Sequence, residues 1–257
     1  MPGTVIAFGG KGGAGKTTLS AMVIRELVRL GKRPILAVDA DPNATLALTL
    51  GEEPGGTIAD IRDRMGEAAL EPSAIPKDRL MDQWLAEILT ESVGFDVLTM
   101  GRPEGPKCYC YVNGLLRRYL KELKGSYAAI VIDCEAGMEY LSRLAVDDVD
   151  TLVLVAEANP IGLTTVRRIA ELADSLPVRV SRRVLALNKV DASTPVEALV
   201  ASGGAPAVDA TVVVPQDAEL RERCIQGRPV DDEAGGASRA AITELTQLCL
   251  EPNLART

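Results

Sequence analysis

A lysine and a threonine that follow a run of glycines near the start of the chain could bind the phosphates of a nucleotide. Residues 9–18 read GGKGGAGKTT, in which Gly10, Gly15, Lys16 and Thr17 have the spacing G-x-x-x-x-G-K-[ST]. Glycines let backbone N–H groups turn toward an anion, and the helix N-terminus behind them adds partial positive charge. The lysine would reach the outer phosphates, and the threonine hydroxyl can be a ligand of Mg²⁺. A glycine-rich turn that binds nothing is the alternative. We predict a phosphate site made by Gly10, Gly12, Gly13, Ala14, Gly15, Lys16, Thr17 and Thr18.

Three aspartates follow apolar, strand-like segments and could hold a metal ion or orient water. Asp39 and Asp41 come after residues 34–38, and alternate residues of an extended chain point the same way. Asp133 comes directly after residues 127–132. The chain has no histidine, so a carboxylate is the natural candidate for positioning an attacking water. One of the pair Asp39 and Asp41 could instead cap the helix that follows it, and so could Asp133.

Cys108 and Cys110 stand two residues apart in a loop rich in glycine and proline. They supply two thiolates from one stretch of backbone, whereas a soft metal with tetrahedral preference needs four ligands. A two-fold dimer would complete a four-cysteine site across its axis. Two incidental loop cysteines, or a labile local disulfide, are the alternatives. Cys134, Cys224 and Cys249 lie on other segments; we expect Cys249 in the core and assign Cys134 no metal role.

Strand-like and helix-like segments alternate along the chain and must position these residues. Because the strand-like segments are apolar on both faces, the pattern predicts an α/β fold of the P-loop NTPase type, with a mostly parallel, twisted sheet of about 7–8 strands covered by helices on both faces. Ligands should then lie beyond the carboxyl ends of the strands. We expect one domain over residues 1–257, with residues 52–91 as a helical elaboration. The expected strands are 4–8, 34–38, 95–99, 127–132, 151–156, 184–187 and 211–214, and the expected helices include 19–30, 43–50, 115–123 and 163–176.

The composition limits the partners and the compartment. A net charge of −8 disfavours nucleic acid and anionic membrane surfaces as partners. No apolar run approaches the roughly 18 residues of a membrane span, and the glycine-rich motif begins where a secretory signal would stand. We therefore predict a cytoplasmic protein with no nucleic-acid or membrane partner, whose cysteines are thiols or ligands and not disulfides.

With a second lysine at position 11, the sequence KGGAGKTT resembles the deviant Walker A motif of the MinD/ParA/nitrogenase iron protein class of P-loop ATPases. The resemblance implies that Lys11 reaches across a dimer interface to the partner's nucleotide, while Lys16 acts in its own subunit. It also implies that Asp41, in the D-x-D-P segment, orients the attacking water.

The same resemblance extends to the metal and to the second switch segment. It implies a Mg²⁺ site in which Asp133 and Thr17 are joined by Asp39, acting through water. The segment that starts with Glu135 resembles switch II, in which Gly137 could let the backbone meet the γ-phosphate.

Two further segments resemble base-reading loops. Residues 188–191, NKVD, resemble the guanine motif of GTPases, in which the aspartate pairs with the purine. In the deviant Walker A class the asparagine alone contacts adenine, and residues 215–217 resemble the second purine loop of that class. We favour ATP, with GTP as the open alternative, and expect base contacts from Asn188, Lys189, Pro215 and Asp217.

Taken together, KGGAGKTT, VDADPN, CYCY and DCEAGMEYLSR resemble the CooC family of nickel-insertion ATPases, over Gly9 to about Asp217. That family matures carbon monoxide dehydrogenase, and the acetyl-CoA synthase maturation ATPases are similar. The resemblance implies a homodimer promoted by ATP and by metal, one Ni²⁺ or Zn²⁺ bound by Cys108 and Cys110 of both subunits, and nickel delivery driven by hydrolysis to ADP. One of the two enzymes would be the client.

Two other functions stay open from the sequence. A MinD- or ParA-like positioning ATPase would need a membrane-seeking tail or a basic DNA-binding face, and the polar ending EPNLART and the acidic charge speak against both. An electron-transfer ATPase like nitrogenase iron protein would hold a [4Fe–4S] cluster with four thiolates. The adjacent C-x-C spacing counts against the cluster, because that family takes its ligands from two distant loops.

Overall fold

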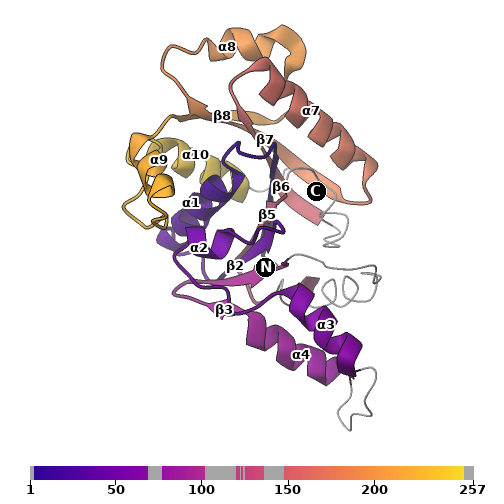
Figure 1. Ribbon diagram of the computed structural model, residues 1–257. Helices are drawn as coiled ribbons and strands as arrows, with labels where there is room; N and C mark the ends of the chain where they lie inside the picture. The colour runs from indigo at the N-terminus through magenta and orange to yellow at the C-terminus, as the bar shows by residue number, and fades with distance from the viewer. Residues whose placement is uncertain are drawn as a thin grey trace.

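The structure is a computed structural model that describes residues 3–68, 77–101, 120–121, 123, 125–135 and 148–251. The described residues form a sheet of eight strands in the order β3-β4-β2-β5-β1-β6-β7-β8 (Figure 1). Neighbouring strands are parallel except β3 and β4, which run antiparallel. The strands are β1 (Thr4–Gly10), β2 (Ile35–Ala40), β3 (Thr90–Glu91), β4 (Phe95–Thr99), β5 (Ala129–Cys134), β6 (Asp148–Glu157), β7 (Arg179–Val190) and β8 (Ala210–Pro215).

Helices follow most of the strands, as the alternating sequence pattern predicts. Figure 1 shows α3 and α4 side by side at the end of the sheet that carries β3, with α7 and α8 at the opposite end. Within the described residues, no helix is both long enough and apolar enough to cross a membrane. The helices are α1 (Lys16–Arg29), α2 (Leu46–Thr49), α3 (Ile58–Ala68), α4 (Lys77–Ile88), α7 (Pro160–Ser175), α8 (Val196–Leu199), α9 (Ala218–Ile225) and α10 (Arg239–Leu250), with a π-helical turn over Val200–Gly204.

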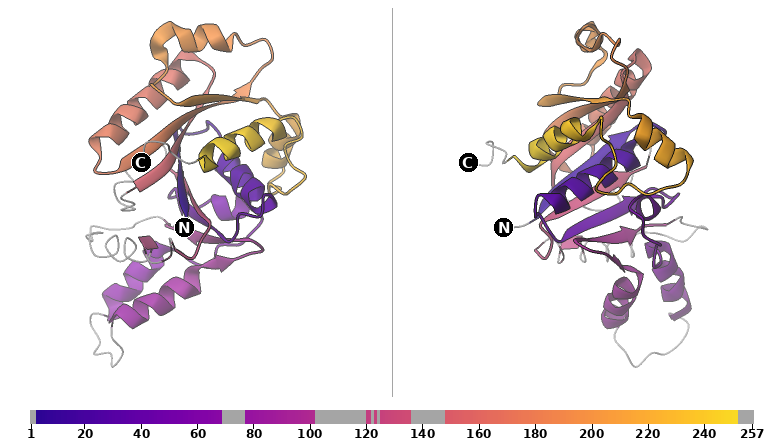
Figure 2. Two further views of the ribbon diagram at one scale, coloured as in Figure 1. Left: turned by 180° about the vertical axis from the view of Figure 1, so that it is seen from behind. Right: turned by 90° about the vertical axis from the view of Figure 1, so that its left-hand side faces the viewer.

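The sheet is buried on both faces, and alternate residues of β1 reach two separate hydrophobic clusters. Val5 and Ala7 pack with residues of α3, α4 and α7, whereas Ile6 and Phe8 pack with residues of α1, α2 and α10. Figure 2 shows α10 lying beside α1, on the same side of the sheet. The predicted mostly parallel sheet with helices on both faces is therefore confirmed, and β1 lies between β5 and β6 near its middle.

The structure differs from the sequence-based expectation at several element boundaries. The helix expected from residue 43 begins at Leu46, because Asp39 accepts a hydrogen bond from the Leu46 backbone N–H and residues 41–45 form the turn before it. Strand β7 continues to Val190, so Asn188 belongs to the strand and not to a loop after it. The short β3 is an antiparallel addition that was not expected. The helix expected at 115–123 lies outside the described residues except for positions 120, 121 and 123.

Candidate nucleotide site

The phosphate motif joins β1 to α1 at the centre of the sheet. A side chain at Gly10 would place its Cβ 2.3 Å from the backbone oxygen of Val155 on β6, so the close approach of these strands requires glycine. Gly15 has φ +98°, and a Cβ there would lie 2.3 Å from Nδ2 of Asn188. The glycine spacing thus reflects packing against β6 and β7 as well as room for phosphate. We call residues 10–16 the P-loop.

The two lysines of the motif lie in different surroundings. Lys16, in the first turn of α1, is buried, and its Nζ donates to the backbone oxygen of Lys11 at 3.4 Å. The residue Lys11 is exposed in the loop. Its action on a partner's nucleotide stays a prediction.

The residues predicted to hold Mg²⁺ come together at the carboxyl ends of the central strands. Thr17 Oγ1 donates a hydrogen bond to Oδ2 of Asp133 at 2.6 Å. The other oxygen of that buried carboxylate, Oδ1, has no hydrogen-bond partner among the described residues. Asp39 and Asp133 are paired in the β2–β5 register. A free buried carboxylate oxygen beside a hydroxyl fits Mg²⁺, which prefers oxygen ligands.

Burial changes the proton affinity of both aspartates. It raises the pKa of Asp133 to about 7, against the hydrogen bond from Thr17, and the nearby charge of Asp39 acts in the same direction as burial. Burial also raises the pKa of Asp39 to about 6, opposed by the backbone N–H groups of Leu46 and Asp41. A bound cation would favour the ionised carboxylates.

Asp39 and Asp41 differ in role within the structure. Asp39 is fully buried, and its two oxygens accept from the backbone N–H groups of Asp41 (3.1 Å) and Leu46 (2.7 Å). It thereby fixes the start of α2, which is the capping role considered above for one of the pair. Asp41 is half-buried and accepts from the backbone and side chain of Asn43 at 2.9 and 2.8 Å. Only Asp41 lines the cavity described next.

A cavity of about 810 Å³ opens beside the P-loop, a volume typical of small-molecule sites. Most of the predicted phosphate and base residues line it, whereas Gly10 ends β1 and Ala14 is buried behind the loop. The predicted residues on its wall are Gly12, Gly13, Gly15, Lys16, Thr17, Thr18, Asp41, Glu135, Asn188, Lys189, Pro215 and Asp217.

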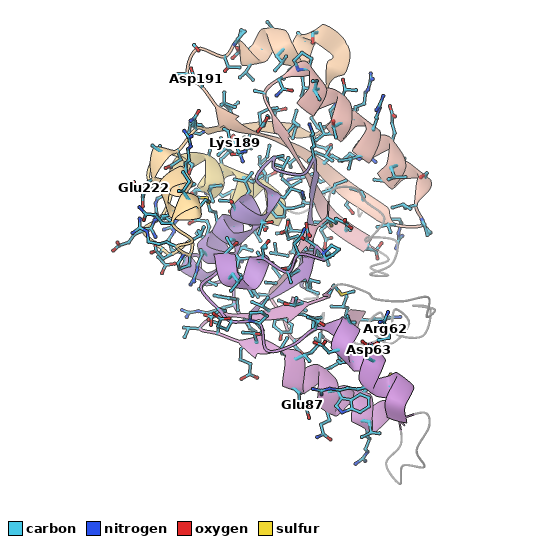
Figure 3. All side chains as sticks on the ribbon, in the orientation of Figure 1. Arg62, Asp63, Glu87, Lys189, Asp191 and Glu222 are labelled. Atoms are coloured by element: carbon cyan, nitrogen blue, oxygen red, sulfur yellow. The ribbon has the colours of Figure 1, made fainter. Side chains whose placement is uncertain are left out.

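The NKVD segment contacts the P-loop with its first two residues and leaves its last residue outside the cavity. Asn188 Nδ2 donates to the backbone oxygen of Ala14 at 2.9 Å, and Lys189 Nζ donates to that of Gly13 at 2.6 Å. Asp191 accepts from the backbone and hydroxyl of Ser193 and closes a turn. Figure 3 shows Asp191 further out than Lys189, on the connection toward α8. Because the aspartate is absent from the cavity wall, this arrangement lends no support to guanine reading.

Asp217 connects the cavity wall to the last helix. Its Oδ1 accepts from the backbone N–H groups of Glu219 and Leu220 at 3.1 Å and caps α9, while Oδ2 accepts from the backbone and hydroxyl of Ser238 at 3.0 Å. Burial acts to raise the pKa of Asp217, but these hydrogen bonds outweigh it and the pKa is lowered. The carboxylate is thus used within the fold, and its contact with a purine stays a prediction.

The predicted soft-metal residues Cys108 and Cys110, and the switch residue Gly137, lie outside the described residues. Within the described part, no group of three or more histidine, cysteine, aspartate or glutamate side chains is arranged to hold a metal ion. Cys134 is buried, and burial raises the pKa of its thiol above the usual range. Cys249 is buried in the core, as expected.

Helix α9 forms a wall of the cavity that the sequence did not indicate. Its residues Leu220, Arg221, Cys224 and Ile225 line the cavity, and Ile225 is 75% exposed. An exposed isoleucine beside a cysteine is a weak signal in a short amphipathic helix. The sequence does not show that α9, which follows β8, lies at the same cavity as the P-loop.

The comparisons with known proteins agree with this geometry. The family model of the CobQ/CobB/MinD/ParA nucleotide binding domain matches residues 5–230. The chain belongs to this family. An uncharacterized ATP-binding protein of Methanocaldococcus jannaschii is 40% identical over 189 residues, which are 72% of this chain and 74% of that protein. The carbon monoxide dehydrogenase accessory protein CooC of Rhodospirillum rubrum is 31% identical over 187 residues, 68% of this chain and 70% of that protein.

Solved structures of the CobQ/CobB/MinD/ParA family share the fold. The cell division ATPase MinD of Pyrococcus furiosus superposes with a TM-score of 0.66 at 24% identity, over 95% of this chain and 97% of that one. Membership makes this chain a nucleotide-binding ATPase that uses ATP with Mg²⁺. The cavity beside the P-loop is the described feature that matches such a ligand in size and in lining.

Proposed function

We propose that this ATPase delivers nickel to carbon monoxide dehydrogenase or to the related acetyl-CoA synthase. One observation carries the ATPase half: Thr17 and the free oxygen of buried Asp133 lie together beneath the P-loop. The nickel half is supported by the Cys108–Cys110 pair together with the similarity to the CooC protein of Rhodospirillum rubrum.

In this proposal each residue of the site has a defined task. The P-loop N–H groups and Lys16 bind the phosphates, and Thr17 with Asp133 would hold Mg²⁺, which supplies charge neutralisation when it is bound. Asp41, on the cavity wall, orients the attacking water. Lys11 is exposed and free to reach a second subunit of a homodimer. Each subunit contributes Cys108 and Cys110 to one nickel ion, which is the cargo and not a resident cofactor.

Metal content and mass in solution test the proposal. Anaerobic protein is titrated with Ni²⁺, with and without Mg·ATP, and compared with a variant carrying Cys108→Ser and Cys110→Ser. We expect one nickel per dimer in the wild-type protein and none in the variant, with ADP binding preserved in both. Cys224→Ser is the matched control, because Cys224 is an exposed thiol outside the pair. Stoichiometric nickel in the double variant would refute the four-cysteine site.

A positioning ATPase is the second candidate, and one comparison favours it. The septum site-determining protein MinD of Bacillus subtilis is 31% identical over 156 residues, 60% of this chain and 53% of that protein. Sedimentation with anionic liposomes or with DNA in the presence of ATP distinguishes the two. ATP-dependent binding to either, combined with no bound nickel, would make positioning the better proposal. A brown anaerobic protein with broad visible absorbance would instead indicate an iron–sulfur cluster.

A further inference from the structure

Two consecutive residues at the end of β7, Asn188 and Lys189, hold two consecutive carbonyl groups of the P-loop. Asn188 Nδ2 lies 2.9 Å from the oxygen of Ala14, and Lys189 Nζ lies 2.6 Å from the oxygen of Gly13. The amide of Asn188 is fixed in turn, because its Oδ1 accepts from the backbone N–H of Lys189 at 2.9 Å. We call Asn188 and Lys189 the loop clamp.

Lys189 of the loop clamp has an unfavourable backbone conformation. Lys189 has φ +59°, in the left-handed region, and the only other described non-glycine residue with positive φ is Ala44. The pairing of β7 with β8 also shifts register between Leu187 and Val190. Irregularities of this kind turn side chains away from the directions that a regular strand would give them. Strained backbone conformations are concentrated at functional sites, and this one keeps Lys189 in contact with the glycine-rich loop.

The hydrogen bonds of the loop clamp determine which way the P-loop peptide groups face. In a planar trans peptide the carbonyl and the following N–H point in opposite directions. By holding the Ala14 oxygen on the β7 side, Asn188 turns the N–H of Gly15 away from β7. By holding the Gly13 oxygen, Lys189 keeps the negative end of that carbonyl from turning toward an anion, which it would repel.

A glutamate directs the ammonium group. Lys189 Nζ lies 3.2 Å from Oε1 of Glu157, which ends β6 and is paired with Asn188 in the β6–β7 register. Both side chains are about half exposed, so the ion pair by itself contributes little to stability. It does hold the ammonium over the loop, between β6 and Gly13.

We propose that Lys189 is a positioning residue for nucleotide binding, which holds the P-loop in its phosphate-binding conformation from outside without touching the phosphates. The proposal deepens the nucleotide site described above and rests on it. It assigns Glu157 a supporting role, since that carboxylate orients the lysine.

The test measures the Kd of Mg·ADP and of a non-hydrolysable Mg·ATP analogue, together with KM and kcat for ATP. In Lys189→Met we expect both Kd values and KM to rise about tenfold, the size of one charge-assisted hydrogen bond, with kcat within about twofold of wild type. Lys189→Arg should recover most of the affinity. Glu157→Gln, which keeps an acceptor for Lys189, should lower the nucleotide affinity about two- to threefold. Lys32→Met is the matched control, because Lys32 is an exposed lysine that does not line the cavity.

Three results would overturn the assignment, and each has a different meaning. A much larger loss for the ATP analogue than for ADP would make Lys189 a direct phosphate ligand. An unchanged Kd and KM with a lower Tm would make it structural only. If Lys189→Arg loses as much affinity as Lys189→Met, the hydrogen bond is not the cause of the loss. Failure of the underlying nucleotide site is recognised separately, because Lys16→Ala would then still bind ADP tightly.

Discussion

Replacing Asp133 with asparagine should make the metal-free protein less sensitive to pH and should abolish its Mg²⁺-dependent ATPase activity. The amide is nearly isosteric and can still accept the hydrogen bond from Thr17. Only the ionisable oxygen is lost. Because Oδ1 has no partner among the described residues, replacing it breaks no described hydrogen bond.

The sign of the pH effect follows from the raised pKa. Asp133 has a pKa of about 7 in the folded state, against an ordinary value of 3.8. Between these values the native state binds more protons than the unfolded state, so the free energy of unfolding falls as the pH rises. For these two pKa values, the fall from pH 5.5 to pH 8.0 is about 2 kcal/mol. The pKa of Asp39, raised to about 6, adds a smaller fall in the same direction.

Urea unfolding in EDTA without nucleotide, at pH 5.5 and pH 8.0, measures this difference. Between the two pH values, the free energy of unfolding of the wild-type protein should fall by about 2 kcal/mol more than that of Asp133→Asn. Asp82→Asn, on the exposed surface of α4, is the control for the same chemical change. Equal pH dependence in wild type and Asp133→Asn would refute the buried-carboxylate argument. Retained Mg²⁺-dependent hydrolysis in Asp133→Asn would refute its assignment as a metal ligand.

Three further predictions concern the supports of the site. Gly10→Ala places a Cβ 2.3 Å from the Val155 backbone oxygen between two central strands, and should lower the free energy of unfolding by about 3 kcal/mol in urea titrations; a loss below about 0.5 kcal/mol would contradict the rigidity assumed here. Asp217→Ala removes the cap of α9 and the bonds to Ser238, and should cost about 2 kcal/mol by the same measurement, with unchanged stability arguing against the linkage. In protein with Cys108→Ser and Cys110→Ser, maleimide should modify Cys224. Saturating Mg·ADP should slow this modification at least about tenfold, because Cys224 lines the cavity. An unchanged rate of modification would place the nucleotide away from α9.

The part of the site that the sequence predicts best is the part built from local spacing. The path from β1 through the P-loop to α1 follows from residues 10–16, in which glycine meets the packing demand at position 10 and the positive φ at positions 13 and 15. The meeting of Thr17 with Asp133 was also predictable, although they lie 116 residues apart. It follows from a general property of parallel sheets, whose strand ends collect at one edge.

The roles of the polar strand-end residues could not be predicted in the same way. Asp39 and Asp41 stand two residues apart, yet only Asp39 accepts the backbone N–H of Leu46 at the start of α2. Asp39 lies within buried β2, whereas Asp41 lies in the turn that follows the strand. Asp217 binds Ser238, 21 residues later, a pairing set by how α9 and α10 pack. Lys189 was predicted to contact a base, whereas its described contacts are with the P-loop and Glu157.

The central position of β1 has a consequence for how the chain acquires its ligand during synthesis. Its neighbours β5 and β6 begin at residues 129 and 148, and the loop clamp follows at 188 and 189. A ribosome must therefore deliver about three quarters of the polypeptide before the first strand has both partners and the P-loop has its support. Such long sequence separations slow folding, because loop closure must precede the contacts that compensate for it. Nucleotide capture is accordingly a late event, and ATP present at cellular concentration would stabilise only chains that have already completed the sheet.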